Sequence, residues 1–192
     1  MPLDPQSLVR WLWFAWLVSW FVAALWSDRT IGRPALRSQL AFRLPMIAGA
    51  ILLFGLHSGV EPTGNVLWRP GAASSWALVG LTVVGLAFTW WARLHLGRLW
   101  SSSVTRKADH RVVDTGPYGI VRHPIYTGII VAAVATSLLP PMVRTVAGAA
   151  CIAVGAYIKA RVEEGFLREQ LGQDAYAAYA RRVPMLVPFV KV

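Results

Sequence analysis

Charged side chains are scarce in this chain of 192 residues. They make up 15% of the sequence, whereas apolar residues make up 56%, and soluble domains usually carry roughly 25% charge. A soluble globular domain is therefore not expected. Five stretches contain no charged residue at all, and they cover 11–27, 44–60, 70–92, 124–143 and 145–158.

These uncharged stretches predict helices that cross a membrane. A helix needs about 17–25 apolar residues to span the hydrocarbon core of a bilayer, and the first four stretches reach that length. The fifth is shorter, but a helix that continues through Lys159 and Arg161 would complete it, because long basic side chains can extend to the interface. The sequence thus predicts an all-α integral membrane protein with five transmembrane helices.

Cysteine and histidine are also rare. Cys151 is the single cysteine and has no partner for an internal disulfide, so packing inside the fifth apolar stretch is its expected role. The four histidines are His57, His95, His110 and His123, and none of them belongs to a cluster with the spacing of a metal site. We therefore expect no bound metal.

Acidic residues are outnumbered by basic ones, nine to nineteen, which gives a net charge of +10. In a soluble protein this excess would suggest nucleic-acid binding. Along a path with five membrane crossings, however, fifteen of the nineteen basic residues fall on one side. The positive-inside rule makes that side cytoplasmic. The N-terminus is then expected outside and the C-terminus inside, with contact to anionic lipid and none to nucleic acid.

Residues 1–192 are expected to form a single membrane domain with two parts. The first part, 8–96, holds three transmembrane helices and carries no motif beyond its hydropathy. Gly80 and Gly85 are expected to allow close approach of a neighbouring helix. The three helices are predicted over 8–26, from near Pro45 onward, and over 74–96.

The second part, 97–192, is expected to be the catalytic half. It begins with a polar cytoplasmic loop and continues into a helical hairpin over 123–160. It ends in a tail that either lies on the membrane surface or folds over the loop and the hairpin. The predicted elements are helices over 124–139 and 142–160, broken at Pro140-Pro141, and an amphipathic helix over about 162–181.

The sequence GPYGIVRHPIYTG, residues 116–128, places reactive side chains where the fourth apolar stretch begins. Ionisable groups at the edge of a membrane helix are costly and tend to mark functional sites. The start of a helix offers unpaired N–H groups that suit an anionic ligand. Arg122 adds a planar donor for carboxylate or phosphate, and Tyr118 and Tyr126 add aromatic faces that can lie against a base or a cation.

An acidic pair, Glu163 and Glu164, stands at the far end of the hairpin. Because a hairpin returns to the depth at which it began, we expect this pair to lie near His123 and Tyr126. The expected site therefore combines both signs of charge, aromatic faces and access to lipid. Such a site suits a cofactor with a carboxylate, an amine, a sugar and a purine, and S-adenosylmethionine has all four.

Two stretches of the sequence resemble the isoprenylcysteine carboxyl methyltransferase family, whose wider group includes phospholipid N-methyltransferases. They are LGRLWSSSVTRKADHRVVDTGPYGIVRHPIYTG, residues 96–128, and KARVEEGFLREQLGQDAYAAYARRVPMLVPF, residues 159–189. The resemblance implies that S-adenosylmethionine binds in a cytoplasmic pocket formed by the last two membrane helices, the preceding loop and the tail. The Gly-rich loop of soluble Rossmann methyltransferases is absent, so that fold is not expected.

The resemblance also implies roles for particular residues. Family members that methylate a prenylated cysteine hold the substrate carboxylate with an arginine shortly before the cofactor-binding glutamate, which corresponds here to Glu163. The aligned position is Lys159, which lacks the bidentate fork of arginine, and Arg161 follows two residues later. The other cofactor contacts would fall on His110, Arg111, Val112, Val113, Tyr118, His123, Pro124, Ile125 and Tyr126, beside Arg122.

The sequence thus predicts methyl transfer from S-adenosylmethionine to a lipophilic acceptor at the cytoplasmic face of the membrane. A carboxylate acceptor would need only a cation to orient it, from Lys159 or Arg161. An amine acceptor would need to lose a proton, with Glu164 as the group that takes it. Acceptors left open are a prenylated cysteine, a phospholipid amine and another small lipophilic molecule. A membrane scaffold or transport component is the alternative without catalysis.

Overall fold

The computed structural model describes residues 4–24, 35–55, 66–97 and 113–190. Regular structure in these residues is helical, apart from one isolated β-bridge between Val66 and Met142. The expected all-α fold is therefore confirmed for this part of the chain. The helices are α1 (Pro5–Ala24), α2 (Leu36–Phe54), α3 (Ala72–Leu96), α4 (Pro117–Ile120), α5 (Pro124–Ser137), α6 (Val143–Leu171) and α7 (Gln173–Arg182).

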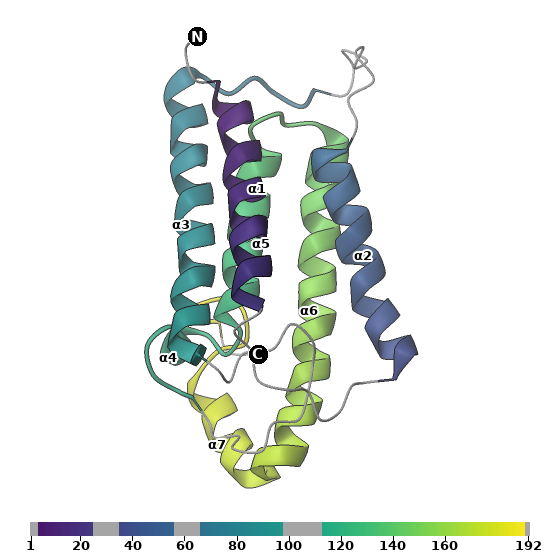
Figure 1. Cartoon of the computed structure of the whole chain (residues 1–192), viewed down its shortest axis with the longest axis vertical. Coiled ribbons are helices and arrows are strands. Elements are labelled where there is room, and N and C mark those ends of the chain that lie inside the picture. The colour runs from purple at the N-terminus through teal and green to yellow at the C-terminus, as the bar shows by residue number, and fades with distance from the viewer. Residues whose placement is uncertain (1–3, 25–34, 56–65, 98–112, 191–192) are drawn as a thin grey trace.

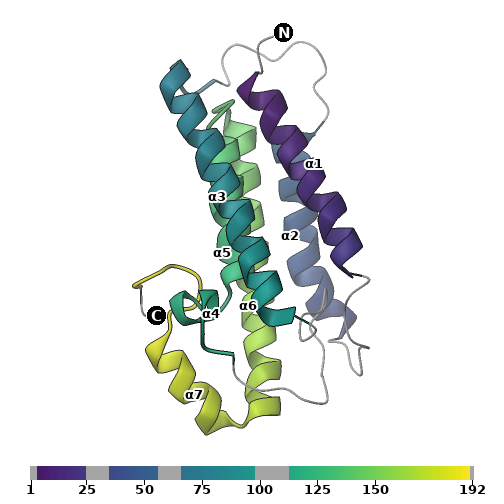
Figure 2. The ribbon, with the colours of Figure 1, turned by 60° about the vertical axis from the view of Figure 1, so that its left-hand side comes forward.

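Four helices, α1, α2, α3 and α6, are long and apolar enough to cross a membrane. The fourth predicted span, 124–143, corresponds to α5, which is apolar but has only 14 residues. At 1.5 Å per residue it is about 21 Å long, less than the roughly 30 Å of a hydrocarbon core. The long helices and α5 run side by side and alternate in direction (Figures 1 and 2). A chain that crosses a membrane five times in succession would need this alternation in direction.

Glycine lets the central helices approach closely, and α5 packs on α3 in this way. A Cβ atom added at Gly85 would lie 2.7 Å from the carbonyl oxygen of Gly128, and one added at Gly128 would lie 2.5 Å from the carbonyl oxygen of Gly85. The prediction for Gly85 is therefore confirmed. The prediction for Gly80 is wrong, because a Cβ atom there would meet nothing within 4 Å.

The tryptophans of α1 divide between lipid and the neighbouring helices. The indole N–H of Trp13 donates to the hydroxyl of Thr136 at 2.9 Å, and that of Trp16 donates to the hydroxyl of Thr89 at 2.7 Å. Trp11 is 67% exposed on the outer face. The interior hydrogen bonds satisfy polar groups that lipid cannot satisfy, and they attach α1 to α3 and α5.

Two predicted helix boundaries are wrong. Pro45 lies inside α2, which already begins at Leu36 and includes Arg37 and Arg43 before the proline. The predicted helix over 162–181 is in fact two helices. α6 continues to Leu171 and ends at Gly172, whose φ of 85° is unstrained only for glycine; α7 follows directly.

The length of α6 positions the candidate site. Its 29 residues extend about 43 Å, so the last turns project beyond the ends of the other long helices. Figure 2 shows α7 turning back from this projecting end toward α4. The start of α5, the last turns of α6 and the tail therefore meet at one end of the bundle.

Candidate active site

Residues 113–123, just before α5, make a tight turn that presents Arg122 and His123. Gly116 takes a φ of 56°, and α4 follows as a single helical turn. His123 is then the N-cap of α5, and no side chain caps that helix. Pro124 occupies the first helical position, where its missing N–H costs nothing. The first turn of α5 therefore directs uncapped backbone N–H groups toward the site.

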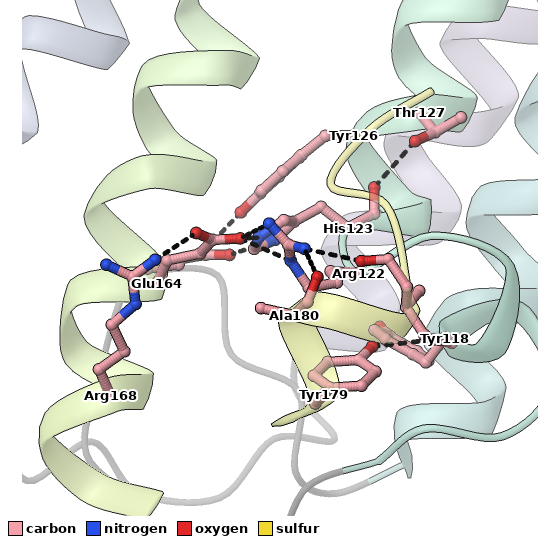
Figure 3. A network of polar contacts seen from close by, with 11 residues as sticks. Tyr118, Arg122, His123, Tyr126, Thr127, Glu164, Arg168, Tyr179 and Ala180 are labelled. Carbon is pink, nitrogen blue, oxygen red and sulfur yellow. Dashed lines mark hydrogen bonds and ion pairs between the residues drawn. The ribbon is translucent and has the colours of Figure 1, made fainter. Parts of the chain in front are cut away.

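Arg122 forms a buried ion pair with Glu164 of α6. Its Nε lies 2.8 Å and its Nη2 2.7 Å from the same carboxylate oxygen, and the two side chains are 6% and 2% exposed. Its Nη1 donates to the carbonyl oxygens of Ala180, at 2.9 Å, and Val183, at 2.7 Å (Figure 3). Each guanidinium nitrogen thus has an acceptor within the protein. This geometry makes Arg122 a residue that joins α5, α6 and the tail, a role the sequence did not indicate.

His123 lies between the two glutamates. Its Nδ1 is 3.6 Å from a carboxylate oxygen of Glu163, and its Nε2 is 3.5 Å from one of Glu164. Burial alone would lower the pKa of His123, but its contacts with the two carboxylates outweigh burial and raise that pKa. The imidazole also stacks on the ring of Tyr126, with centroids 5.7 Å apart. A protonated imidazole in this position offsets part of the negative charge.

Tyr126 connects the acidic pair to an aromatic and cationic cluster. Its hydroxyl donates a short hydrogen bond to Glu163. The ammonium of Lys159, one helical turn before Glu163, lies 5.2 Å from the centre of the Tyr126 ring and 5.6 Å from that of Phe42. Both distances fall in the cation–π range. Phe42 belongs to α2, where the sequence predicted no functional residue. A phenylalanine in an apolar stretch carries no sequence signal for contact with a cation.

The tail is fastened to the start of α5 through backbone atoms. The N–H of Arg122 donates to the carbonyl of Pro184 at 2.8 Å, and that of His123 donates to the carbonyl of Met185 at 3.1 Å. The hydroxyl of Tyr179 on α7 donates to the carbonyl of Tyr118 at 2.8 Å (Figure 3). Of the two predicted arrangements, the tail has the one that folds back over the hairpin.

The buried tyrosines of α4 and α7 remain neutral. Burial raises the pKa of the Tyr118 hydroxyl and that of Tyr179. The ring of Tyr118 stacks on His95, from the last turn of α3, at a centroid distance of 6.3 Å. Tyr118 therefore joins α3, α4 and α7 beneath the site.

The structure brings most of the predicted site residues together. The expected approach of Glu163 to His123 and Tyr126 is confirmed by the contacts above. Arg161 lies apart: it is exposed, and two residues along a helix turn its side chain about 200° from Lys159. Pro124 is buried beside the site, Ile125 and Val113 are half-buried, and His110, Arg111 and Val112 lie outside the described residues.

The arrangement can hold a cation and an anion side by side. The carboxylate of Glu163 and the ring faces of Tyr126 and Phe42 suit a cation, and the uncapped first turn of α5 suits an anion. No group of three or more His, Cys, Asp or Glu side chains that could hold a metal ion occurs among the described residues.

Comparison with known proteins gives consistent matches. The model of the isoprenylcysteine carboxyl methyltransferase family matches residues 78–168. The chain is 30% identical over 162 residues to protein-S-isoprenylcysteine O-methyltransferase B of Arabidopsis thaliana, covering 80% of this chain and 81% of that protein. It is 28% identical over 116 residues to probable protein-S-isoprenylcysteine O-methyltransferases of Oryza sativa subsp. indica and subsp. japonica, covering 59% of this chain and 54% of each of theirs.

Proposed function

The chain belongs to the isoprenylcysteine carboxyl methyltransferase family, and we propose that it transfers a methyl group from S-adenosylmethionine to a lipophilic acceptor at the cytoplasmic face of a membrane. The observation that carries this proposal is the meeting of Glu163 with His123 and Tyr126 where α5 begins. The chain path supports the cytoplasmic side, because fifteen of the nineteen basic residues fall on the side of the site.

The donor would bind between α5 and α6. We assign its sulfonium to the surroundings of Glu163 and the Tyr126 ring, where negative charge and an aromatic face both favour a cation. We assign its carboxylate to the first turn of α5, because that turn has no side-chain cap. The resemblance supplies the remaining donor contacts, in the segment that contains His110 and Arg111.

The geometry favours a carboxylate over an amine as the acceptor. Lys159 lies inside the site and can orient an anion, whereas Arg161 is exposed. An amine would require a base, and the candidate, Glu164, is already paired with Arg122, at 2.7 Å, and with Arg168, at 3.3 Å. A carboxylate held by two cations is a poor proton acceptor. Phospholipid amine methylation is therefore the second candidate.

The proposed reaction balances without a proton transfer. The acceptor oxygen forms a bond to the methyl carbon, the carbon–sulfur bond breaks, and its electron pair stays on sulfur. A carboxylate and a sulfonium thus become a neutral ester and a neutral thioether. Holding the two reactants in line can contribute roughly 7–11 kcal/mol. The protein's part is to position Lys159 beside the acceptor and Glu163 beside the donor.

Methyl transfer from labelled S-adenosylmethionine by protein reconstituted in vesicles tests the proposal. We expect label in a prenylated cysteine analogue with a free carboxylate and none when that carboxylate is amidated. Label in extracted phospholipid instead would favour the amine reaction. Calorimetric titration with S-adenosylhomocysteine tests the donor site separately, and binding that is unchanged in Glu163→Ala and His123→Ala would contradict the site assignment.

A further inference from the structure

The C-terminal segment, residues 183–190, ends in an uncharged apolar tip. This tip, residues 187–190, reads Val-Pro-Phe-Val. Phe189 is 96% exposed, Val187 57% and Val190 49%. Single exposed apolar residues are common on proteins. Three on one short turn form an apolar patch of the kind that contacts a membrane or another protein.

Hydrogen bonds direct this segment along α5. The hydroxyl of Thr127 lies 2.6 Å from the carbonyl oxygen of Leu186 and 3.2 Å from that of His123. Thr127 lies in the first turn of α5, an apolar helix packed on α3. The segment therefore turns back along the helices after α7. Figure 2 shows it in yellow, looping outward above α4 at about the level where α3 ends.

That level is the edge of the lipid-facing surface. The last turns of α3, a candidate membrane span, expose Trp91 by 47% and Leu94 by 59%. Ile120 of α4 is 39% exposed. The apolar tip thus lies at about the same level as exposed apolar side chains of a candidate membrane span.

Charge on both sides of the segment matches a lipid headgroup layer. No residue from 183 to 190 is charged, whereas Arg181 and Arg182 precede it and Lys191 follows it in the sequence. Apolar residues flanked by basic ones are typical of segments that lie in the interface of an anionic membrane. A bilayer provides both a hydrophobic layer and negative charge.

We propose that the apolar tip inserts into the lipid of the leaflet at which the candidate site lies. Met185 and Leu186 pack in one cluster with Tyr126, so the segment forms a wall of the site. That wall is then held by protein hydrogen bonds on one side and by lipid on the other. The proposal depends on the fold and not on the reaction.

Spin labelling measures the depth of the tip directly. A nitroxide is attached to Phe189→Cys in a Cys151→Ser background, in vesicles of phosphatidylcholine and phosphatidylglycerol. We expect oxygen, which concentrates in the acyl region, to relax the label more than a water-soluble nickel complex does. Leu94→Cys provides the lipid-facing reference, and Asp174→Cys, exposed on α7, provides the aqueous one.

Two results would overturn the proposal. In the first, the label at position 189 is as accessible to nickel as the label at position 174. In the second, it is shielded from both reagents, which would indicate contact with a second copy of the chain. Val187→Cys repeats the measurement at an independent position of the tip. Because depth is read without substrate, failure of the proposed methyl transfer would leave this result unaffected.

Discussion

The two ends of the α5–α6 hairpin are held together by opposite chemistry. At the closed end, the Thr145 hydroxyl lies 2.9 Å from the Ser137 carbonyl oxygen and 3.1 Å from the Met142 nitrogen, so neutral hydrogen bonds complete the turn. At the open end, Arg122 and Glu164 form a buried ion pair beside His123. Burying charges costs several kcal/mol of desolvation per ion. Because neutral hydrogen bonds join the two helices at the closed end, we infer that the buried ion pair at the open end serves the proposed function as well as folding.

Removing Arg122 should give the largest effect. Arg122→Gln leaves the Glu164 carboxylate buried without its main partner, and breaking such a pair typically costs about 3–5 kcal/mol. We expect the free energy of unfolding in detergent to fall by that order, together with loss of S-adenosylhomocysteine binding. Thermal unfolding and calorimetric titration measure the two effects.

The matched control for this change is Arg168→Gln. Arg168 contacts the same carboxylate at 3.3 Å, but its side chain is 49% exposed. Exposed pairs contribute about 0–1 kcal/mol, so stability and binding should change little. Equal losses of stability in Arg122→Gln and Arg168→Gln would show that burial does not make the Arg122–Glu164 ion pair stronger than an exposed one.

A change at the closed end should affect stability alone. Thr145→Val keeps the volume but removes the hydroxyl that lies 2.9 Å from the carbonyl oxygen of the buried Ser137. A buried acceptor left without its partner costs about 1–3 kcal/mol. We expect a lower unfolding temperature with unchanged affinity for S-adenosylhomocysteine below that temperature. Weaker binding by the folded variant would contradict the division of roles between the two ends.

Lys159 should control the acceptor and leave the donor unaffected. Lys159→Gln removes the cation beside Tyr126, and we expect KM for a carboxylate acceptor to rise about tenfold, equivalent to roughly 1.4 kcal/mol. Donor affinity should stay within error. Arg161→Gln, on the exposed side of α6, is the matched control. A larger rise in KM from this variant would show that Arg161, and not Lys159, holds the acceptor.

The smallest expected effect is a pH dependence from His123. Its pKa is raised in the folded state, so the stabilisation by the protonated ring is complete below about pH 6.5, its ordinary value. This stabilisation is lost as pH rises through the higher folded-state pKa. The unfolding temperature should therefore fall across that range, and His123→Gln should lack this step. An identical pH profile in the variant would assign the titration to another group.

The sequence was sufficient to predict the elements that carry a periodic or local signal. Uncharged stretches located the long helices, and the hairpin placed Glu163 near His123, because a helical pair must return to its starting depth. The 162–181 prediction failed at Gly172, although a glycine there is a common helix terminus. The Pro45 prediction failed because a proline inside a membrane helix is tolerated when neighbours satisfy the freed carbonyl.

Contacts that depend on tertiary structure could not be predicted in this way. Arg122 was expected to bind a cofactor, yet its partners include the carbonyls of Ala180 and Val183, about sixty residues away. Any residue type presents such a carbonyl, so the sequence does not mark it. Phe42 was missed for a related reason, since only the packing of α2 on α6 brings its ring to Lys159.

The bonds that fix the tail have an evolutionary consequence. Arg122 and the N–H groups of residues 122 and 123 bind main-chain oxygens, so they recognise the route of the tail and not its side chains. A substitution at position 180 keeps the carbonyl that Arg122 binds, whereas position 122 admits no shorter donor. The closure between α5 and the tail therefore constrains the backbone route of the tail more than the identity of the residues that supply these carbonyls.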